Sequence, residues 1–476
     1  MKNLTSLITG FTKFALKPFN TRFKQLFEND PSIDRGYQVD ITCVNEGGLA
    51  PMEATMELEI INHDIDNMVF GDSTVLSGKE LAIDHDGLKE YLLEDRRLQD
   101  IDIQIAKPGE SCRIGVVFDI IEPRAKEAGS GSDFPGLLGP FAVAGQGSTH
   151  VLRGSAVTVI DPSAVPGITS KVLEMQGEPA SASPYGNLHH LVLSPKVLDD
   201  SPRHVVQNVL RMLSVKAAVY LGNAAQGKKS DQVEIYSQNE NDNESREGIP
   251  RIAYIAQIHG HQMTVEEDEP ILYGSNTEGM MPILLNPNEI LDGALVASYW
   301  VMRVETYFYQ NHPLIKELLS RHQSKEITFT GVIATVAASK ETDRNRNCML
   351  AASMAKSTLK ADGVVLTKYG GGAPHVDMGE TARLCEAMGM PTVVQVSDSS
   401  GDRKAESAML FNYPEVDAVV YGGGGDTGWD VGTPERVIAG TPGVAKTLKD
   451  MKYIEGAALC GITNQQGASK IRATVY

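Results

Sequence analysis

The residues best suited to acid-base chemistry lie in the stretch 107–157. A glycine-rich turn and Thr149 directly precede His150, and Glu122 and Arg124 stand close by in the sequence. A histidine in such surroundings could act as a general acid or base, and an arginine could bind a carboxylate. Glu122 and Arg124 could equally form a structural ion pair. The candidate catalytic residues are therefore His150, Arg124 and Glu122.

A second polar stretch runs from residue 367 to residue 377 and reads Thr-Lys-Tyr-Gly-Gly-Gly-Ala-Pro-His-Val-Asp. It follows a predicted strand and precedes a predicted helix, so its glycines could let backbone N–H groups approach an anion or carboxylate at the helix start. It lacks the spacing of a dinucleotide fingerprint or a P-loop, and a plain flexible connection is the alternative. The predicted substrate-binding residues are Ser111, Thr149, Gly370, Gly371, His375 and Asp377.

The histidines and cysteines do not indicate a metal site. His189-His190 and His259-Gly-His261 could ligate a metal, but their spacing fixes no third ligand. Hydrogen-bonded histidines are the favoured interpretation, and no metal is predicted. The cysteines lie far apart and form no C-x-x-C pair, which indicates neither a disulfide framework nor a zinc knuckle. They are expected to be buried small side chains rather than nucleophiles. They are Cys43, Cys112, Cys348, Cys385 and Cys460.

Composition narrows the class of protein. The chain has 476 residues and a formal net charge of −18, which argues against nucleic-acid binding because phosphate neutralisation requires a basic face. No apolar run reaches the roughly 18 residues that a membrane span requires. The separated cysteines fit a reducing compartment, so a cytoplasmic location is expected.

The first 55 residues differ from the rest of the chain. Apolar residues recur at roughly helical spacing over residues 1–30, with lysines and an arginine between them, which gives a basic amphipathic segment on an acidic protein. Pro18 would kink or divide such a helix. Docking on this protein or on a partner subunit is the favoured interpretation, and contact with a membrane surface is the alternative. Residues 31–55 are predicted to be a linker.

The fold class is predicted to be α/β, with a β-rich N-terminal domain followed by α/β layers. Alternating or continuous apolar runs predict the strands of a β-rich domain over residues 56–157. An α/β domain follows over residues 158–322. Its segment 227–250 is rich in Ser, Asn, Gln, Glu and Asp, and is predicted to be an exposed loop.

Residues 323–476 show the clearest pattern. Strands and helices alternate there at a spacing that predicts a doubly wound, mainly parallel sheet. The predicted strands are 327–335, 363–367, 392–396 and 418–421, and the predicted helices are 345–359 and 379–388. Right-handed crossovers would place the loops that follow these strands along the carboxyl edge of the sheet, where such folds bind ligands.

Short motifs in the segment 107–157 occur in an order that resembles a known family. The order is Pro108-Gly-Glu-Ser111, Ile121-Glu-Pro-Arg124, Gly129-Ser-Gly131, Phe134-Pro-Gly136 and Thr149-His150. It resembles the proprotein of component B of the glycine/sarcosine/betaine reductases, the precursor of the alpha and beta subunits. The resemblance covers about residues 56–476 and leaves the first 55 residues outside.

The resemblance implies a substrate-activating subunit. In such proteins the precursor is cut at an Asn-Cys bond, and the cysteine becomes a pyruvoyl group that forms a Schiff base with an amine substrate. A partner subunit with selenocysteine then attacks the activated carbon. A pyruvoyl carbonyl is an electron sink, which ordinary side chains do not supply.

This chain departs from that pattern downstream of Asp292-Gly-Ala294. The resemblance implies Asn-Cys there, but the sequence continues Leu-Val-Ala-Ser-Tyr-Trp-Val-Met-Arg, and no cysteine lies between Cys112 and Cys348. No cofactor is therefore predicted, and a pyruvoyl group is not expected. The implied partner is a reductase subunit that carries selenocysteine or cysteine, and the implied substrate is a small molecule.

Three interpretations follow. In the first, the chain is an unprocessed paralogue that binds a substrate needing no Schiff base, in a pocket of His150, Arg124 and the loop near Gly370. In the second, Ser298 supplies a pyruvoyl group by serinolysis, although no Asn precedes it. In the third, the chain is a non-catalytic scaffold or regulatory subunit, because a retained fold is poor support for retained chemistry.

Overall fold

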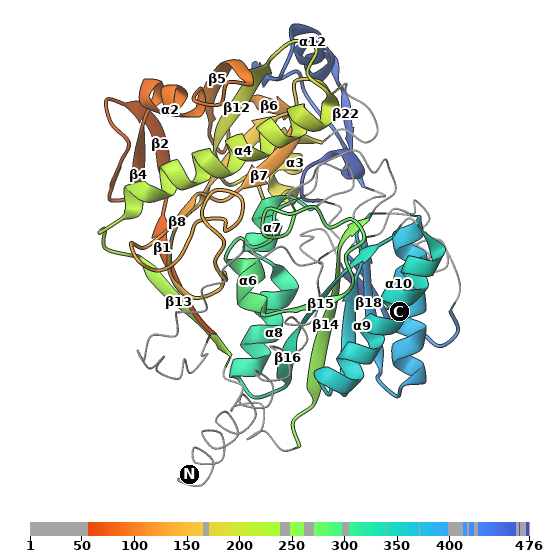
Figure 1. Cartoon of the computed structure of the whole chain (residues 1–476). Coiled ribbons are helices and arrows are strands. Elements are labelled where there is room, and N and C mark those ends of the chain that lie inside the picture. Colours follow the sequence, from red (N-terminus) through yellow and green to blue (C-terminus); the bar gives the residue numbers. More distant parts are fainter. Residues whose placement is uncertain are drawn as a thin grey trace, which may run out of the picture. The chain divides into compact units, whose positions relative to one another are not determined.

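The computed structural model describes most of the chain beyond residue 55, and residues 55–476 form one compact unit (Figure 1). The described residues are 56–164, 171–238, 248–260, 271–297, 304–338, 340–370, 372–397, 413–416, 418–422, 427–462, 466 and 473–475. The predictions for residues 1–55, His261, Ser298 and Gly371 lie outside them. No helix in the described part is long and apolar enough to cross a membrane.

The N-terminal part is rich in strands, as predicted. Alternating residues such as those of 56–61 become strands with one buried face. Its elements are β1 (Met56–Asp64), β2 (Asn67–Gly71), β3 (Val75–Ser77), β4 (Glu80–Asp84), α2 (His85–Leu92), β5 (Leu98–Ala106), β6 (Cys112–Gly115), β7 (Val117–Ile121), β8 (Arg124–Lys126), β9 (Gly147–Arg153) and β10 (Ser155–Ile160).

The middle of the chain completes the N-terminal sheets and begins the C-terminal sheet. Its elements are β11 (Val172–Glu174), α3 (Gly177–Ala182), β12 (His189–Val197), α4 (Arg203–Gly222), β13 (Gln232–Gln238), β14 (Arg251–Gly260), β15 (Ile283–Leu285), α6 (Pro287–Leu291), α7 (Thr306–Gln310) and α8 (Pro313–Gln323). The two four-stranded sheets have the orders β13-β1-β9-β8 and β5-β12-β10-β7. The long helix α4 packs against β7, β8 and β10 (Figure 1). The domain boundary predicted at 157/158 falls inside β10.

One prediction for the middle segment was wrong for residues 232–238, and its residues 239–247 lie outside the described part of the chain. Residues 227–250 were expected to form an exposed loop, but β13 lies within them and pairs antiparallel with β1. Three of its six described side chains are exposed and Tyr236 is buried. An edge strand with one partner can carry polar residues, so its polar composition does not conflict with strand pairing. Pairing with a distant strand supplied the hydrogen bonds that the local sequence does not specify.

The C-terminal third supplies most of the predicted, mainly parallel sheet, and β14 and β15 of the preceding segment, which was predicted to be a separate domain, complete it. Its elements are β16 (Thr328–Ala337), α9 (Glu341–Ser353), η2 (Met354–Thr358), β17 (Gly363–Thr367), α10 (Ala373–Ala387), β18 (Thr392–Ser397), β19 (Ala418–Gly422), β20 (Gly428–Asp430), β21 (Arg436–Ile438), α12 (Pro442–Asp450), β22 (Tyr453–Glu455) and β23 (Ala473–Val475). The sheet order is β15-β16-β14-β17-β18-β19-β23, with β16 to β19 and β14 parallel.

Two helices begin earlier than their apolar periodicity predicts. Helix α9 begins at Glu341 instead of residue 345, and α10 begins at Ala373 instead of residue 379. The first turn of α9 carries acidic side chains, which are favourable at a helix N-terminus. Pro374 lies in the first turn of α10, where its missing N–H costs no helical hydrogen bond. The first residue of each helix is therefore determined by side chains that are favourable at a helix N-terminus, and not by the first residue of the apolar face.

Helices cover both faces of the parallel sheet. Tyr254 and Ile258 of β14 pack in the same apolar cluster as Ile315 of α8. Their neighbour Ile255 packs in a second cluster with Ala351 of α9 and apolar residues of α10. Because successive side chains of a strand point to opposite faces, α8 lies on one side and α9 with α10 on the other (Figure 1). The loops that follow the parallel strands lie at the carboxyl edge of the sheet.

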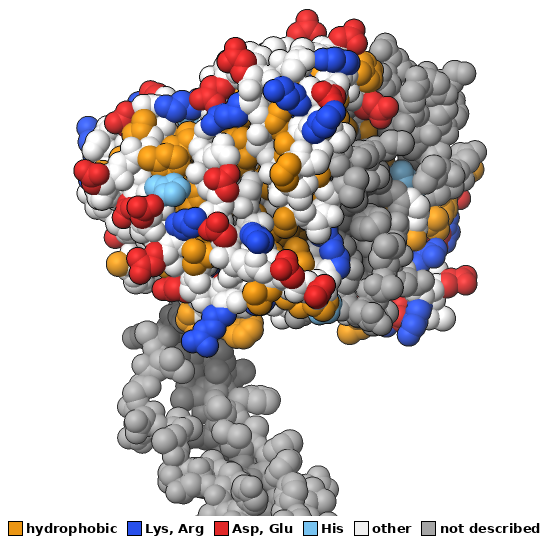
Figure 2. Space-filling model, turned by 90° about the horizontal axis from the view of Figure 1, so that it is seen from above, with side chains coloured by type: hydrophobic (Ala, Val, Ile, Leu, Met, Phe, Trp, Pro, Cys, Tyr) orange, Lys and Arg blue, Asp and Glu red, His pale blue; other side chains and the backbone are white. Residues whose placement is uncertain are grey.

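Charged side chains of both signs are interspersed over the face seen in Figure 2. Such mixing of acidic and basic side chains gives little attraction for a polyanion.

Candidate functional site

The strand order places a topological switch point between β14 and β17. Numbered along the chain, the five parallel strands have the order 2-1-3-4-5. The connection from β14 leads to β16 on one side, and the connection from β16 crosses back to β17 on the other. Ligands of open parallel sheets bind outside the carboxyl ends of the strands at such a point. The candidate site therefore lies where β14 ends at Gly260 and β17 ends at Thr367.

The loop after β17 is tied to the end of β14. The backbone N–H of Tyr369 donates to Gln257 Oε1 over 3.1 Å, and Gln257 Nε2 donates to the carbonyl oxygen of Pro374 over 3.1 Å. The rings of His259 and Tyr369 meet edge to face with their centroids 5.8 Å apart. A side chain of β14 thus holds both Tyr369 near the start of the loop and Pro374 in the first turn of helix α10 (Ala373–Ala387).

Lys368 is the first residue of this loop and was not among the predicted site residues. Its side chain is buried, with 2% of the residue exposed. Among the described residues its Nζ contacts only the carbonyl oxygen of Gly370 and no carboxylate. Burial alone lowers the pKa of the Lys368 amine to about 7. A buried lysine of this kind is partly neutral at physiological pH and can act as a nucleophile or base.

The glycines of the loop allow it to lead directly into helix α10. Gly370 and Gly372 both have φ of +70°, a conformation that other residues rarely adopt. Helix α10 has 15 residues, Gly372 is its N-cap, and no side chain caps its first turn in the described structure. Pro374 in its first turn has no N–H, and the His375 N–H donates to the carbonyl oxygen of Gly372 over 3.0 Å, so mainly the helix dipole favours an anion here.

His375 and Asp377, two predicted binding residues, lie in the first turns of α10. Both are buried. Asp377 Oδ1 accepts a hydrogen bond from Arg344 Nε of α9 over 2.8 Å. Burial raises the pKa of Asp377 to about 6, and the nearby Arg344 opposes that rise. The structure thus brings Gly370, His375 and Asp377 to the same end of the sheet as Lys368.

His150 forms a hydrogen-bonded chain on β9. Its Nδ1 lies 3.0 Å from His63 Nε2, and its Nε2 is hydrogen-bonded to Glu127. Both histidines are buried, whereas 42% of the Glu127 side chain is exposed. Burial and the neighbouring His150 lower the pKa of His63, and the hydrogen bond with His150 lowers the pKa of Glu127. The chain connects a buried imidazole to the surface and could move a proton between them.

Arg124 and Thr149 face away from His150. Strands β8 and β9 pair with Ala125 opposite His150, so Arg124 projects from the other face of the sheet. Arg124 donates to Glu122 Oε2 over 2.7 Å and to the carbonyl oxygen of Leu291 over 2.6 Å. This buried ion pair connects β8 to the end of α6. No described contact joins it to the His150 chain.

Thr149 belongs to the same face as Arg124 and is held by Asp292. Thr149 Oγ1 donates to Asp292 Oδ1 over 2.8 Å, and Gly145 N donates to Asp292 Oδ2 over 2.7 Å. Lys126 Nζ forms an ion pair with the same carboxylate over 2.5 Å. The hydroxyl of Thr149 is therefore engaged in packing the glycine-rich turn against the segment after α6.

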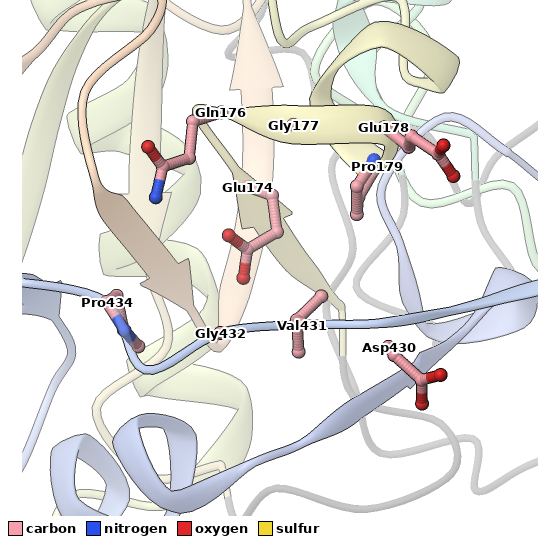
Figure 3. Close-up of a pocket in the computed structure, with 9 residues that line it drawn as sticks. All are labelled: Glu174, Gln176, Gly177, Glu178, Pro179, Asp430, Val431, Gly432 and Pro434. Atoms are coloured by element: carbon pink, nitrogen blue, oxygen red, sulfur yellow. The ribbon is translucent and has the colours of Figure 1, made fainter.

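Ser111 lies beside a different feature, a surface pocket of about 250 Å³ (Figure 3). Its Oγ accepts hydrogen bonds from Gln176 Nε2 over 2.9 Å and from Glu435 N over 3.1 Å. Gln176 lines the pocket, and Figure 3 shows carboxylates of Glu178 and Asp430 around it. The described contacts do not connect Ser111 with the loop 368–374.

The described residues contain no group of three side chains that could hold a metal. His190 is hydrogen-bonded to Thr158 Oγ1 and to the carbonyl oxygen of Tyr185, and burial lowers its pKa to about 4. The cysteines in the described part are buried, and burial raises the pKa values of Cys348 and Cys385 to about 12. These thiols are poor nucleophiles at neutral pH.

Comparison with known proteins identifies the family. The chain matches the model of the glycine/sarcosine/betaine reductase component B subunits over residues 56–460. It is 29% identical over 440 residues to the glycine reductase complex component B subunits alpha and beta of Acetoanaerobium sticklandii, which covers 88% of this chain and 100% of that protein. It is 28% identical over 405 residues to the sarcosine reductase complex component B subunit alpha of Peptoclostridium acidaminophilum, which covers 84% of this chain and 91% of that protein.

A third relative, the glycine reductase complex component B subunits alpha and beta of Peptoclostridium acidaminophilum, is 30% identical over 408 residues, covering 85% of this chain and 91% of that protein. No solved structure matches the chain. The family match takes in both N-terminal four-stranded sheets and nearly all of the parallel sheet. The chain therefore belongs to the family of glycine/sarcosine/betaine reductase component B subunits.

Proposed function

We propose that this protein is the substrate-binding subunit of a reductase complex that cleaves a C–N or similar carbon–heteroatom bond of a small molecule, and that it works without a pyruvoyl group. The observation that carries the proposal is the family match over residues 56–460 in a chain that has no cysteine between Cys112 and Cys348. The relatives are named as subunits of reductase complexes, which supports assembly with further subunits. We propose that one of these carries the reducing selenocysteine or cysteine.

The alternative in which Ser298 forms a pyruvoyl group predicts a cut before that residue. Ser298 lies outside the described residues, but the two described ends of its segment meet, because Ala297 N donates to Thr306 Oγ1 over 3.0 Å. Both of these residues are buried. Fragments held together in this way could remain associated after a cut, so the mass must be measured on denatured protein.

The purified full-length protein is expected to run as one chain near 51.5 kDa on denaturing electrophoresis, with an intact mass equal to the uncut sequence. The physical reason is that no thiol is present in the segment between Asp292 and Thr306 to attack the backbone. Two fragments split before Ser298 would contradict the proposal and support the pyruvoyl alternative. A single chain contradicts that alternative.

A further test concerns the predicted catalytic residue His150. His150→Gln is expected to lower turnover of the reconstituted complex by roughly 100-fold or more, because positioned acid-base groups contribute about 10²–10⁴-fold. His85→Gln is the matched control, since His85 is partly exposed on α2 and contacts only Phe70 and Asp86 among the described residues. Melting temperatures should stay within a few degrees for both variants.

Unchanged turnover in His150→Gln would favour a structural role for the His63–His150–Glu127 chain. Arg124 and Glu122 remain predicted contributors, but their buried contacts with Leu291 and Asn311 mean that their removal would also weaken the fold. His150 is therefore the better position for separating chemistry from stability.

If the chain is a scaffold or regulatory subunit, the complex forms with it, but its own residues take no part in the reaction. If the complex forms and turns over equally well with every site variant, the alternative is supported. Deleting residues 1–30 tests whether the basic N-terminal segment docks on a partner. Loss of co-purification of the reductase subunit, with retained folding of the remaining chain, would support that docking role, and undiminished co-purification would contradict it.

A further inference from the structure

We infer that His63 is a positioning residue for His150, and that these two rings, here called the histidine pair, together hold one proton more than two neutral imidazoles. This deepens the proposed function by naming the proton that the site would supply during bond cleavage, and its part in turnover rests on that function. The inference depends on the two rings and on the group that accepts a hydrogen bond at each end of the pair.

Strands β1 and β9 place the two rings next to each other. They pair in parallel, with Ile61 opposite His150 and Leu152 opposite His63, so both histidines project from the same face of the sheet. His63 Nε2 lies 3.0 Å from His150 Nδ1. Helix α4 and the short helix η1 (Asn223–Ala225) contact β9, and both histidines are buried. The hydrogen bonds of these rings therefore depend on the neighbouring protein groups.

The outer end of the histidine pair is a carboxylate. His150 Nε2 is hydrogen-bonded to Glu127, whose side chain is 42% exposed. This hydrogen bond lowers the pKa of Glu127, so its carboxylate is ionised at neutral pH. An ionised carboxylate can only accept hydrogen bonds. The hydrogen between Glu127 and His150 must therefore belong to His150 Nε2.

The inner end of the histidine pair is a backbone carbonyl. His63 is hydrogen-bonded to the backbone of Lys229, and this contact favours the protonated ring, which identifies the backbone group as the carbonyl oxygen. The turn that carries Lys229 is fixed beside His63, because Asp64 N donates to Asp231 Oδ2 over 2.8 Å. Since His63 Nε2 faces His150, the hydrogen directed at Lys229 lies on His63 Nδ1.

The number of hydrogens in these contacts gives the charge of the histidine pair. The ring nitrogens take part in three hydrogen bonds: one to Glu127, one to the carbonyl of Lys229, and one between the rings. Each bond needs its own hydrogen, because the carboxylate and the carbonyl offer only lone pairs. Two neutral imidazoles carry one N–H each, so a third hydrogen is required. A neutral pair would leave one of these buried contacts without a hydrogen, which is costly.

The extra proton lies on His150. Burial and the neighbouring His150 lower the pKa of His63, which favours a neutral His63. A neutral His63 with its hydrogen on Nδ1 has a lone pair on Nε2 and accepts from His150 Nδ1. His150 is then doubly protonated beside the ionised Glu127, and the charge of Asp231 adds to the negative side of the balance at His63. His63 thus acts through His150, by accepting its Nδ1 hydrogen.

The exposed carboxylate gives the proton a path to the surface. The N–H bond of His150 Nε2 breaks, its electron pair stays on the ring, and the proton passes to Glu127. The neutral carboxyl group then gives the proton to the lone pair of a basic atom at the surface, such as the nitrogen of a departing amine. Nothing is oxidised or reduced in these steps, and a proton from solvent restores the charged pair through Glu127.

NMR of the full-length protein with nitrogen-15 in its histidine rings tests the number of hydrogens. A ring nitrogen without a hydrogen gives a signal well separated from that of a protonated one. At pH 7 the histidine pair is expected to show three protonated nitrogens and one bare nitrogen, His63 Nε2. A second bare nitrogen should appear as the pH is raised. Two bare nitrogens at pH 7, or none, would overturn the inference.

Variants identify these signals among the 11 histidines of the chain. Signals lost in His63→Gln or in His150→Gln belong to the histidine pair, and either variant alone is sufficient. His85→Gln is again the matched control and should leave the signals of the pair in place. In His63→Leu the acceptor for the Nδ1 hydrogen is lost, so His150 is expected to gain a bare nitrogen at pH 7. An unchanged, doubly protonated His150 in this variant would contradict the positioning role.

The pH profile of turnover in the reconstituted complex separates positioning from a merely structural role. In His63→Leu the alkaline loss of turnover is expected to move to lower pH by about one unit or more, because the charged His150 has lost a hydrogen-bond partner. His63→Gln retains an acceptor oxygen, so its profile should stay within about 0.5 unit of the wild type. A structural role would lower turnover in both variants without moving the profile, and that result would overturn the inference. The NMR measurement needs no complex, so failure of the proposed function can be told from failure of the inference.

Discussion

Lys368→Met is expected to stabilise the folded protein by roughly 4 kcal/mol at pH 7. The stability gain follows from the burial of this amine, whose pKa falls from an ordinary 10.5 to about 7 on folding. Methionine has a similar length and no charge to desolvate. An amine buried at such a cost is typical of a site where function conflicts with stability.

The stability of the wild-type protein depends on pH through Lys368, and the direction of this dependence follows from its lowered pKa. Between about pH 7 and pH 10 the unfolded chain binds a proton at Lys368 that the folded protein does not, so wild-type stability rises with pH in this window. Below about pH 7 both states are protonated, and the cost of the buried charge is complete. The advantage of Lys368→Met is therefore largest at and below neutral pH and shrinks toward pH 10.

Urea unfolding of both proteins at pH 7 and at pH 10 measures these differences. Lys356→Met is the matched control, because its exposed amine should contribute within about 0.5 kcal/mol at either pH. A Lys368→Met variant that is less stable than the wild type, or equally stabilised at both pH values, would contradict the predicted burial of an uncompensated amine.

Much of the fold could be predicted from apolar periodicity alone. The runs 327–335, 363–367, 392–396 and 418–421 became the parallel strands β16 to β19, because buried strands require continuous apolar residues. The central position of β14 between β16 and β17 could not be predicted in the same way. Strand order depends on which edges pair in space, and several orders are compatible with one apolar pattern. The switch point, and with it the importance of Lys368, became visible only in the assembled sheet.

The candidate site was predictable only in part, for a related reason. His150 and Arg124 are close in sequence, but the register of β8 against β9 sends them to opposite faces of one sheet. His63, the partner of His150, comes from β1 and carried no local signal. Lys368 did carry one, since a lysine at the end of an apolar strand and directly before a glycine-rich loop has few routes to water.

Asp119→Ala is expected to destabilise the protein by about 3–5 kcal/mol, the loss that follows when one partner of a buried ion pair is removed. Asp119 is fully buried on β7 and accepts from Arg211 Nη1 of α4 over 2.9 Å. It also accepts from Thr306 N over 2.9 Å and from Thr306 Oγ1 over 2.6 Å. The variant removes the carboxylate that balances the buried guanidinium and three hydrogen bonds at once.

The contacts of Asp119 also affect the segment that holds Ser298. Thr306 Oγ1 also accepts the N–H of Ala297, so Asp119 indirectly fixes both described ends of the segment that holds Ser298. That segment is the place where the family resemblance implies processing. Weakening of its ends should therefore increase proteolytic cutting between Ala297 and Thr306 at urea concentrations that leave the wild type intact.

Urea unfolding and limited proteolysis of Asp119→Ala test both effects against Asp450→Ala, in which an exposed carboxylate paired with exposed Lys446 is removed. The control should lose less than about 0.5 kcal/mol, because surface ion pairs contribute little. The double variant Asp119→Ala/Arg211→Met should recover part of the loss, since it removes the buried charge as well as its partner. Equal losses for Asp119→Ala and Asp450→Ala, or strictly additive losses in the double variant, would show that the Asp119–Arg211 pair does not act as a buried unit.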